Sequence, residues 1–447
     1  ASIAVVYGIG WQLQNPRTGL LAAYFVAFSF LHVRDSHFLT VDIPGLFFAL
    51  LSIFFALRFA HTHHRNSLVA AGIFLGLAAS TKYNLGLFAP IVYWILFANT
   101  ALGKRYQYAL LLSGAIIGSF ACASPYIALD FATFWRDLSF ERAHFAAGHG
   151  MDLGIGWIYH ATTSLPLGLG WPLFVLALIG LVRWAWRGGH MEYALLVGFL
   201  SYYGMAGSGK LVFMRYVLPL IPLLCLAAAA LLEPLARRFL PRGMVWGIAF
   251  MAVAPTAHAS WQHSYLLAQT DTRVLAAEWI EQHIETGVAI AVCGVSDYDF
   301  TRLRRTPQQL QQILHQLREA GLAARRVERE LIYLSDDKRP RYEVIEFLAG
   351  DPLQSKRWTV KSLSDHGINW LVTHERNGQM GSGKSIFPIA TELVNAELVQ
   401  CFDPFVDSDS TAPIYDAIDA FYMPVQGFDA ITRPGPRICI YHLGVGK

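Results

Sequence analysis

Long apolar runs separated by short polar stretches fill the first part of the chain, and the second part has the mixed pattern of a soluble protein. Runs with few charges cover residues 18–33, 43–60, 67–81, 84–100, 107–128, 168–185, 191–206, 213–232 and 243–259. A spanning helix needs about 20 apolar residues, so the shorter runs imply tilted helices or a locally thinned membrane. We therefore predict a polytopic α-helical membrane domain over residues 1–260 and a water-soluble domain over residues 261–447.

Two details of this pattern refine the membrane domain. Residues 3–11 resemble the second half of a spanning helix and not a signal peptide, which predicts that the chain begins inside a membrane helix. The apolar stretch from Ser67 to Ala98 is too long for one crossing and carries Thr81-Lys82-Tyr83-Asn84 at its centre. We predict a helical hairpin that turns there, with Lys82 at the membrane surface.

The soluble part mixes helical and strand patterns. Helical spacing occurs at residues 271–283, 307–320 and 387–396, and apolar strand-like runs occur at 288–293, 370–373 and 438–441. This combination predicts a small α/β domain at the C-terminal end of the chain.

Composition supports the membrane assignment. The 447 residues are 54% hydrophobic and only 15% charged, with a mean hydropathy of +0.37, which is far more apolar than a soluble domain. The net charge is only +3, and no basic stripe suited to nucleic acid is present. We expect membrane lipids as partners and no nucleic acid.

Lys and Arg mark the orientation of the membrane domain, because cytoplasmic loops carry an excess of them. One alternating set of connections is basic and almost free of acid, which makes it cytoplasmic; its members are Arg17, Arg58, Arg65, Lys104, Arg105, Arg183, Arg187, Arg237, Arg238 and Arg242. The other set holds Asp42, Lys82, residues 130–167, the Lys210 to Arg215 stretch and the soluble domain. We therefore expect these to share the extracytoplasmic face of the membrane.

Asp42, within Thr40-Val-Asp-Ile-Pro44, stands at the mouth of an apolar helix. It has two interpretations. An ionisable group at the edge of a membrane segment is costly and suggests a functional site, but Asp42 can also be a helix N-cap with Pro44 in the first turn.

Several cations accompany Asp42 on the same face. Lys82 and Arg215 can be interfacial side chains that reach out of the membrane, or they can pair with the phosphate of an anionic lipid. The glycine-rich stretch from Gly204 to Lys210 is interpreted as a mobile turn that presents Lys210. A carboxylate beside these cations can act as a base or hold a divalent cation.

Four short segments, in this order along the chain, resemble the motifs of a known protein family. The segments are Arg17-Thr-Gly-Leu-Leu-Ala-Ala23, His32-Val-Arg-Asp-Ser-His-Phe-Leu-Thr-Val-Asp42-Ile-Pro, Gly76-Leu-Ala-Ala-Ser-Thr-Lys82-Tyr83 and Arg215-Tyr-Val-Leu-Pro-Leu-Ile-Pro222. Over residues 1–260 the chain resembles bacterial membrane glycosyltransferases of the GT-C superfamily, and is most similar to the protein O-mannosyltransferase-like family 39 and aminoarabinose-transferase-like group.

The resemblance implies transfer of a sugar from a polyprenyl-phosphate donor to a lipid, glycan or protein acceptor outside the membrane. It assigns Asp42 and His37 to the catalytic site and Lys82, Tyr83, Lys210 and Arg215 to the donor phosphate. The family's principal catalytic carboxylate would lie upstream of Ala1, in which case the chain as given lacks it and is inactive. Asp35 departs from the family motif, where an uncharged residue is expected.

The outer loop between residues 130 and 167 is a second candidate site. Its start, Phe131 to Phe140, is amphipathic and aromatic, as in helices that lie in the membrane interface. Glu141, His144 and His149 follow, and three hypotheses stay open for them: a metal site, substrate contact, or interfacial polar residues.

Two further features of the soluble domain say little about function. Residues 378–385 match the P-loop pattern, but they follow no strand closely and lie outside the cell, so we expect a Gly/Ser loop and no nucleotide. Three of the five cysteines, Cys293, Cys401 and Cys439, lie in this domain, where one disulfide of undetermined pairing can form.

The main rival from another class is a transporter or lipid-binding protein without chemistry. Transporters usually place ionisable groups near the bilayer midplane, often in repeated halves. Here the charges gather at one surface and the sequence shows no such repeat, which favours the glycosyltransferase.

Overall fold

The computed structural model describes residues 1–148, 153–239, 241–294, 299–333, 338–348, 359–375, 393, 396–406, 413–416, 419 and 422–444. The chain divides into two compact units, Ala1–Ser264 and Tyr265–Lys447. Each unit is described by itself.

The first unit is helical throughout its described residues. Its elements are α1 Ser2–Leu13, α2 Pro16–Ala27, α3 Phe30–Ser36, α4 Asp42–Thr62, α5 Arg65–Thr81, η1 Tyr83–Phe88, α6 Ala89–Ala98, α7 Leu102–Ala123, α8 Tyr126–Leu129, α9 Phe131–Ala147, α10 Gly156–Tyr159, η2 His160–Ser164, α11 Leu165–Leu169, α12 Trp171–Arg187, α13 His190–Ala206, η3 Met214–Leu220, α14 Ile221–Phe239 and α15 Arg242–Leu267. The predicted apolar runs overlap these helices, with an exception at residues 18–33.

Three helical stretches of the described chain are long and apolar enough to cross a membrane, namely Asp42–Thr62, Leu102–Ala123 and Met214–Phe239. A fourth is formed if Gly156–Leu169 and Trp171–Arg187, which meet at a bend of 117°, make one span. Gly170 lies at this bend with a φ of 75°, which favours glycine.

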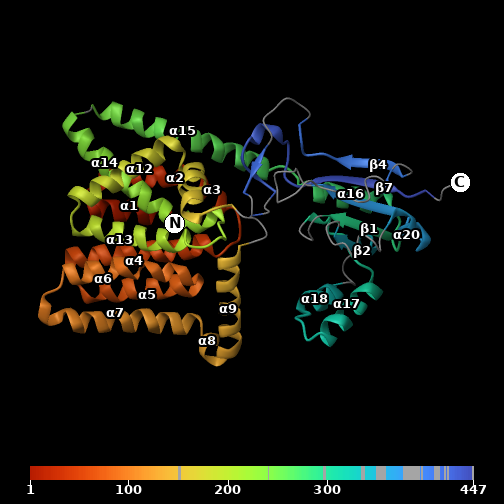
Figure 1. Ribbon diagram of the computed structural model, residues 1–447, viewed down its shortest axis with the longest axis horizontal. Helices are drawn as coiled ribbons and strands as arrows, with labels where there is room; N and C mark the ends of the chain where they lie inside the picture. The colour runs from red at the N-terminus through yellow and green to blue at the C-terminus, as the bar shows by residue number, and fades with distance from the viewer. Residues whose placement is uncertain are drawn as a thin grey trace. The chain divides into compact units, whose positions relative to one another are not determined.

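The helices α4, α5, α6 and α7 run side by side (Figure 1). Gly72 and Gly76, four residues apart on α5, face α7 so closely that an added Cβ would lie 3.0 Å and 2.3 Å from the carbonyl oxygens of Leu112 and Ile116. Small residues at this spacing let membrane helices approach to backbone contact. The pair therefore fixes the position of α5, which ends beside the candidate site.

One predicted helix is wrong. The run at 18–33 is not continuous, because α2 ends at Ala27 and α3 begins at Phe30. Ser29 lies in the break with an extended backbone, and its hydroxyl donates a hydrogen bond to the carbonyl of Gly168. This hydrogen bond joins residues 139 positions apart in the chain. Local hydropathy cannot predict such a contact, and it did not predict the break.

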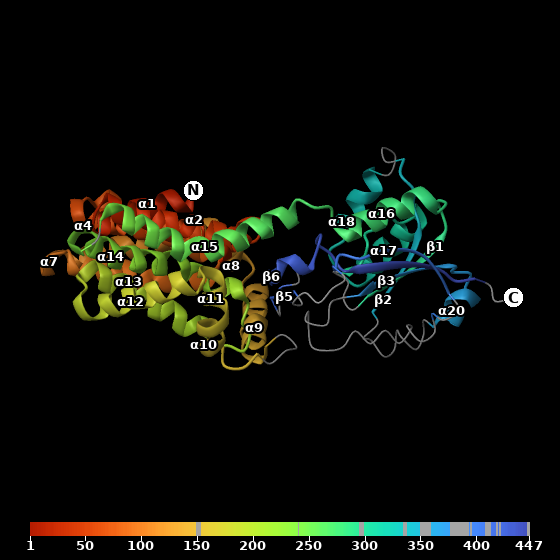
Figure 2. The same ribbon diagram turned by 90° about the horizontal axis from the view of Figure 1, so that it is seen from above.

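The amphipathic segment that begins at Phe131 forms α9, which crosses the end of the helical bundle at a steep angle to α4–α7 (Figures 1 and 2). Its Phe131 and Trp135 rings are more than half exposed and stack with centroids 6.2 Å apart. This orientation and exposure suit a helix in the membrane interface.

The second unit is an α/β domain. Its strands are β1 Ala289–Gly294, β2 Glu343–Leu348, β3 Trp370–Glu375, β4 Glu397–Phe402, β5 Ile414–Tyr415, β6 Pro424–Gln426 and β7 Arg437–His442, and its helical segments are α16 Thr272–His283, α17 Pro307–Glu319, α18 Arg325–Ile332, α20 Val360–Asp365 and η7 Phe428–Ala430. The main sheet has the order β2-β1-β3-β7-β4. Strands β2, β1 and β3 are parallel, whereas β7 runs antiparallel to both neighbours.

Alternate residues of β1 build the two faces of this sheet. Ile290 and Val292 pack with α16 in one core, and Ala291 and Cys293 pack with Leu363 of α20 in the other. The helices predicted near 271 and 307 and the three predicted strands are confirmed. The helix predicted at 387–396 and the P-loop-like segment at 378–385 lie outside the described residues.

Candidate functional site

Asp42 and Lys82 form an ion pair at the mouth of the helical unit. The Asp42 carboxylate accepts a hydrogen bond from the Lys82 ammonium, with Oδ1 and Nζ 2.5 Å apart. Only 4% of Asp42 and 19% of Lys82 is exposed. Asp42 is the first residue of α4, and the N-cap is Val41, with no side-chain capping bond. The capping interpretation of Asp42 is therefore wrong.

Local geometry brings the two residues together. Lys82 is the extended residue between α5 and η1, so its side chain leaves the helix at the turn that the sequence predicts. Gly45, in the first turn of α4, has no side chain, and an added Cβ would lie 2.5 Å from Leu85 of η1. The close approach of α4 to η1 thus places Asp42 beside Lys82.

Tyrosine rings complete this site. The Lys82 ammonium lies 4.9 Å from the centroid of the Tyr216 ring, in cation–π range. Tyr202 of α13 is fully buried and lies close enough to Asp42 and Tyr216 to interact with them electrostatically. Arg215 lies next to Tyr216, with its guanidinium 4.5 Å from the Phe213 ring centroid. Neither tyrosine was predicted from the sequence, although Tyr216 belongs to the same motif as Arg215.

The turn that carries Lys210 is packed and not a mobile loop, which corrects the prediction. An added Cβ on Gly207 would overlap the Trp157 ring, and one on Gly209 would overlap the Phe145 ring. The Lys210 backbone N–H donates to the Phe145 carbonyl, 3.1 Å away. The Lys210 side chain is exposed, so a packed turn presents this cation to the surface.

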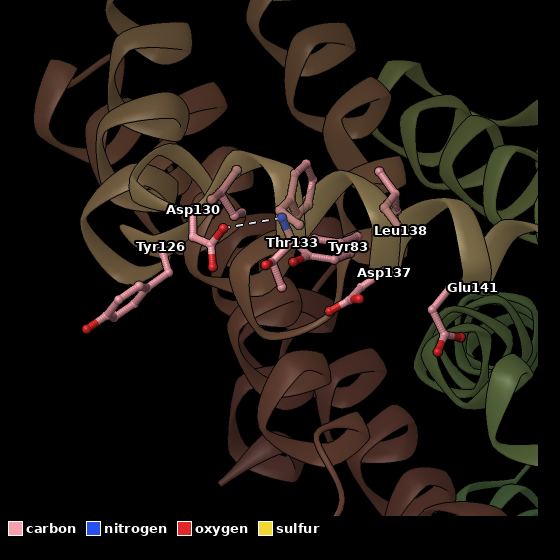
Figure 3. A pocket seen from close by; sticks show the side chains of 9 residues that line it. Tyr83, Tyr126, Asp130, Thr133, Asp137, Leu138 and Glu141 are labelled. Carbon is pink, nitrogen blue, oxygen red and sulfur yellow. Dashed lines mark hydrogen bonds between the residues drawn. The ribbon is translucent and has the colours of Figure 1, made fainter. Parts of the chain in front are cut away.

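An acidic and aromatic pocket of 320 Å³ lies between Tyr83 and the helices α8 and α9 (Figure 3). Figure 3 shows the carboxylates of Asp130, Asp137 and Glu141 along one side of α9. Asp130 caps this helix through the Thr133 N–H. Tyr83 and Lys82 therefore belong to different sites. Lys82 pairs with Asp42, whereas Tyr83 lines the pocket and its ring contacts Phe134 of α9.

The predicted loop triad is only partly described. Glu141 lines the pocket, and His144 stacks on Phe140 at 6.0 Å, while His149 lies outside the described residues. Within the described ranges no three His, Cys, Asp or Glu side chains are arranged to hold a metal ion. Asp42, the other candidate ligand, is engaged by Lys82. The described donors do not fit a metal site, so no chemical step is assigned to a metal.

His37 lies on the neighbouring helix end. Its Nδ1 is 2.8 Å from the Val33 carbonyl oxygen, and its ring is 5.7 Å from that of His263 on α15. Arg34 and Asp35 are buried nearby, with the nearest guanidinium and carboxylate atoms 3.6 Å apart. The burial of Asp35 makes it a structural partner of Arg34 inside the unit, which its sequence position did not indicate.

Comparison with known proteins agrees with this fold. Residues 1–127 match the model of a family described as dolichyl-phosphate-mannose-protein mannosyltransferase. No curated protein sequence matches the chain. Among solved structures, ArnT from Cupriavidus metallidurans bound to undecaprenyl phosphate has a TM-score of 0.51 and 11% identity, covering 100% of this chain and 82% of that one.

Two other membrane enzymes match with lower scores. The Archaeoglobus fulgidus oligosaccharyltransferase tethered with an acceptor peptide has a TM-score of 0.43 and 14% identity, over 83% of this chain and 56% of that one. The mycobacterial arabinofuranosyltransferase AftD has a TM-score of 0.43 and 15% identity, over 99% of this chain and 33% of that one. The chain thus spans little more than half the length of the oligosaccharyltransferase. The match to ArnT confirms the predicted fold: this is a multi-pass membrane protein with the GT-C glycosyltransferase fold and a C-terminal α/β domain.

Proposed function

We propose that this protein transfers a sugar from a polyprenyl-phosphate donor to an acceptor hydroxyl or amine at the outer face of the bacterial cytoplasmic membrane. The observation that carries the proposal is the buried ion pair of Asp42 and Lys82, 2.5 Å apart at the mouth of the helical unit. A carboxylate can accept a proton from the acceptor, and an ammonium can pair with the leaving phosphate. The match to a mannosyltransferase family over residues 1–127, which include both residues, supports it.

The pair suggests how the reaction proceeds. The donor phosphate competes with Asp42 for Lys82, and when it binds there the carboxylate becomes free to accept the acceptor's proton. The acceptor atom then attacks the anomeric carbon, the bond from that carbon to the phosphate oxygen breaks, and polyprenyl phosphate leaves with the electron pair. A single displacement of this kind inverts the anomeric configuration.

Other cations of the same face would assist the leaving group. Arg215 precedes Tyr216, the residue that contacts Lys82, and Lys210 lies earlier in the same segment. Positive charge near the phosphate stabilises the negative charge that develops on its oxygen. The pocket beside Tyr83 and Glu141 is the proposed acceptor site, because tyrosine rings and carboxylates together suit a sugar or an amine. No nucleotide is required by this scheme.

Release of polyprenyl phosphate from a panel of polyprenyl-phosphate sugars tests the proposal, and it is measured on full-length protein with any residues that precede Ala1 in place. We expect Asp42→Asn to lower kcat by about 100-fold or more, since proton transfer to a positioned base contributes at least that much. We expect a similar loss for Lys82→Ala, which removes the leaving-group cation. Lys104→Ala is the matched control, because this exposed lysine starts α7, at the end of α6 remote from Lys82.

A double variant separates chemistry from folding. Removal of one partner leaves a buried charge unpaired and destabilises the protein, whereas Asp42→Asn with Lys82→Met leaves no unpaired charge. If this double variant keeps the thermal stability of the wild type and lacks turnover, the pair acts in catalysis. Turnover that is indifferent to these changes, or donor binding without turnover in the wild type, would favour a lipid-binding protein or transporter.

A further inference from the structure

A second pocket of the helical unit has no part in the proposed reaction. It has a volume of 670 Å³ and lies between α1 and α4; its lining residues are Ala4, Tyr7, Gly8, Trp11, Gln12, Gln14, Phe54, Arg58, His61 and Thr62. The pocket reaches the last turn of α4, whereas Asp42 is the first residue of that helix. A helix of this length spans about 30 Å, so the two sites lie at opposite ends of the unit.

The mouth of this pocket is basic. Arg58 is exposed, and among the residues that the structure describes its guanidinium forms no hydrogen bond or ion pair. The lining contains no Asp or Glu. His61 lies beside it, with Nε2 2.8 Å from the Gln12 carbonyl oxygen. A cation without a carboxylate partner in a pocket suits a phosphate group.

Apart from Gln12, Gln14 and Thr62, the rest of the pocket lining is apolar. Tyr7 and Trp11 of α1 lie 5.9 Å apart between ring centroids, and Trp11 is 55% exposed, as tryptophans at the membrane surface often are. Gly8 faces Phe54 so closely that an added Cβ would lie 2.7 Å from the ring. One end of the pocket thus offers charge and the other offers an apolar wall for a hydrocarbon chain.

The surrounding surface has the same sign of charge. The α4–α5 connection contains His63, His64 and Arg65, all exposed, and the Arg65 Nε donates to the Tyr108 hydroxyl of α7, 3.3 Å away. Lys104 and Arg105 begin that helix. Basic residues at the cytoplasmic surface attract anionic lipids, at about 1 kcal/mol for each Lys or Arg.

We propose that the pocket between α1 and α4 binds an anionic phospholipid of the cytoplasmic leaflet, with Arg58 pairing with its phosphate and one acyl chain lying along Tyr7, Gly8 and Phe54. This lipid is distinct from the sugar donor, which is assigned to the opposite surface. The inference does not depend on the proposed glycosyl transfer, since it rests on the shape and charge of a different pocket.

Native mass spectrometry of the protein in detergent tests the proposal. The protein is titrated with dioleoyl-phosphatidylglycerol, with dioleoyl-phosphatidylcholine, and with the water-soluble glycerophosphoglycerol. We expect tight binding of phosphatidylglycerol only. Arg58→Gln should weaken it about five-fold, the equivalent of 1 kcal/mol. Arg187→Gln removes a comparably exposed arginine from the end of α12, outside the pocket, and should leave binding unchanged.

Three results would overturn the proposal. Equal affinity for phosphatidylcholine would show that the charge is irrelevant, and an equal loss in both arginine variants would show that only overall charge matters. Tight binding of glycerophosphoglycerol would assign the pocket to a soluble phosphate ester instead. Arg58→Lys, which keeps the charge, should retain most of the affinity and so excludes a folding defect as the cause.

Discussion

At the scale of single residues, Lys82 stands out because it contacts two kinds of partner at once. Its ammonium bonds to the Asp42 carboxylate and lies over the Tyr216 ring. An ammonium that is four-fifths buried needs such compensation, because a buried charge without partners is costly. The Tyr216 ring also holds the Lys82 ammonium in position when its ion pair with Asp42 is broken.

We therefore predict a graded response at Tyr216. Tyr216→Leu removes the cation–π contact and should weaken donor binding about five-fold, which corresponds to about 1 kcal/mol for such a contact. Tyr216→Phe keeps the ring and should behave like the wild type. The KM for the donor, measured separately from kcat, checks this; equal defects in both variants would point to the hydroxyl instead.

In the α/β domain, His374 is a buried titratable residue whose two ring nitrogens both lie within hydrogen-bond distance of a partner. It is fully buried, its Nδ1 lies 3.0 Å from the Cys293 carbonyl oxygen, and its Nε2 accepts from the Thr301 backbone N–H. Burial lowers the pKa of His374 from 6.5 to about 4. Because this residue ties β3 to the end of β1, its role is structural.

The lowered pKa predicts acid sensitivity. Below pH 6.5 His374 is protonated in the unfolded chain, but in the folded chain it stays neutral until about pH 4. The free energy of unfolding therefore falls as the pH drops through this window, by up to about 3 kcal/mol. Hydrogen exchange of the β1 and β3 amides at pH 7 and pH 5, corrected for intrinsic rates, measures it. The expected extra opening at pH 5 should be absent in His374→Gln.

At the scale of elements, close helix contact depends on glycine positions that sequence periodicity alone does not rank. Gly76 on α5 touches the backbone of α7, whereas Gly114 on α7 has open space where a Cβ would be. Both are glycines in apolar helices. Only the tertiary structure distinguishes the packed one from the free one.

This contrast gives a matched test. Gly76→Ala should lower the melting temperature, because its methyl group would lie 2.0 Å from the Ser119 hydroxyl and force α5 away from α7. Gly114→Ala should be neutral or slightly stabilising, since alanine favours helix. A cost of 1–3 kcal/mol is typical of such overpacking. Equal melting temperatures for the two variants would contradict the contact.

Much of the fold could be predicted from the sequence because hydropathy and strand patterns are local. The turn at Lys82 and the helix at 307–320 follow from short-range signals of this kind. The break at Ser29, the packing of Gly207 and Gly209 on aromatic rings, and the contact of Lys82 with Tyr216 could not be predicted. Each depends on segments far apart in the chain, and sequence spacing carries no information about such contacts.

At the scale of the whole molecule, the helical unit has a predicted orientation in the membrane. The basic connections predict which ends of the helices face the cytoplasm. In the α/β domain, Cys401 of β4 and Cys439 of β7 are joined by a disulfide, which the sequence allowed without fixing the pair. Disulfides persist mainly in oxidising compartments, and on this ground we predict an extracytoplasmic position for the domain.

Cysteine labelling tests this orientation. In a Cys122→Ala background, we expect Arg136→Cys on α9 to react with a membrane-impermeant maleimide in intact cells, since Arg136 is 73% exposed. Lys104→Cys, at the start of α7, should react only after the cells are opened. The reverse labelling would invert the topology and place the Asp42–Lys82 site on the cytoplasmic side.

The pairing of Asp42 with Lys82 has a kinetic consequence. In the resting protein each group satisfies the other, so an acceptor that arrives first meets a carboxylate that is already occupied. In the proposed reaction, the donor phosphate is the anion that displaces the carboxylate from Lys82. The two substrates would then bind in a compulsory order, donor before acceptor, because the salt bridge keeps the carboxylate unavailable to an acceptor until the donor has bound.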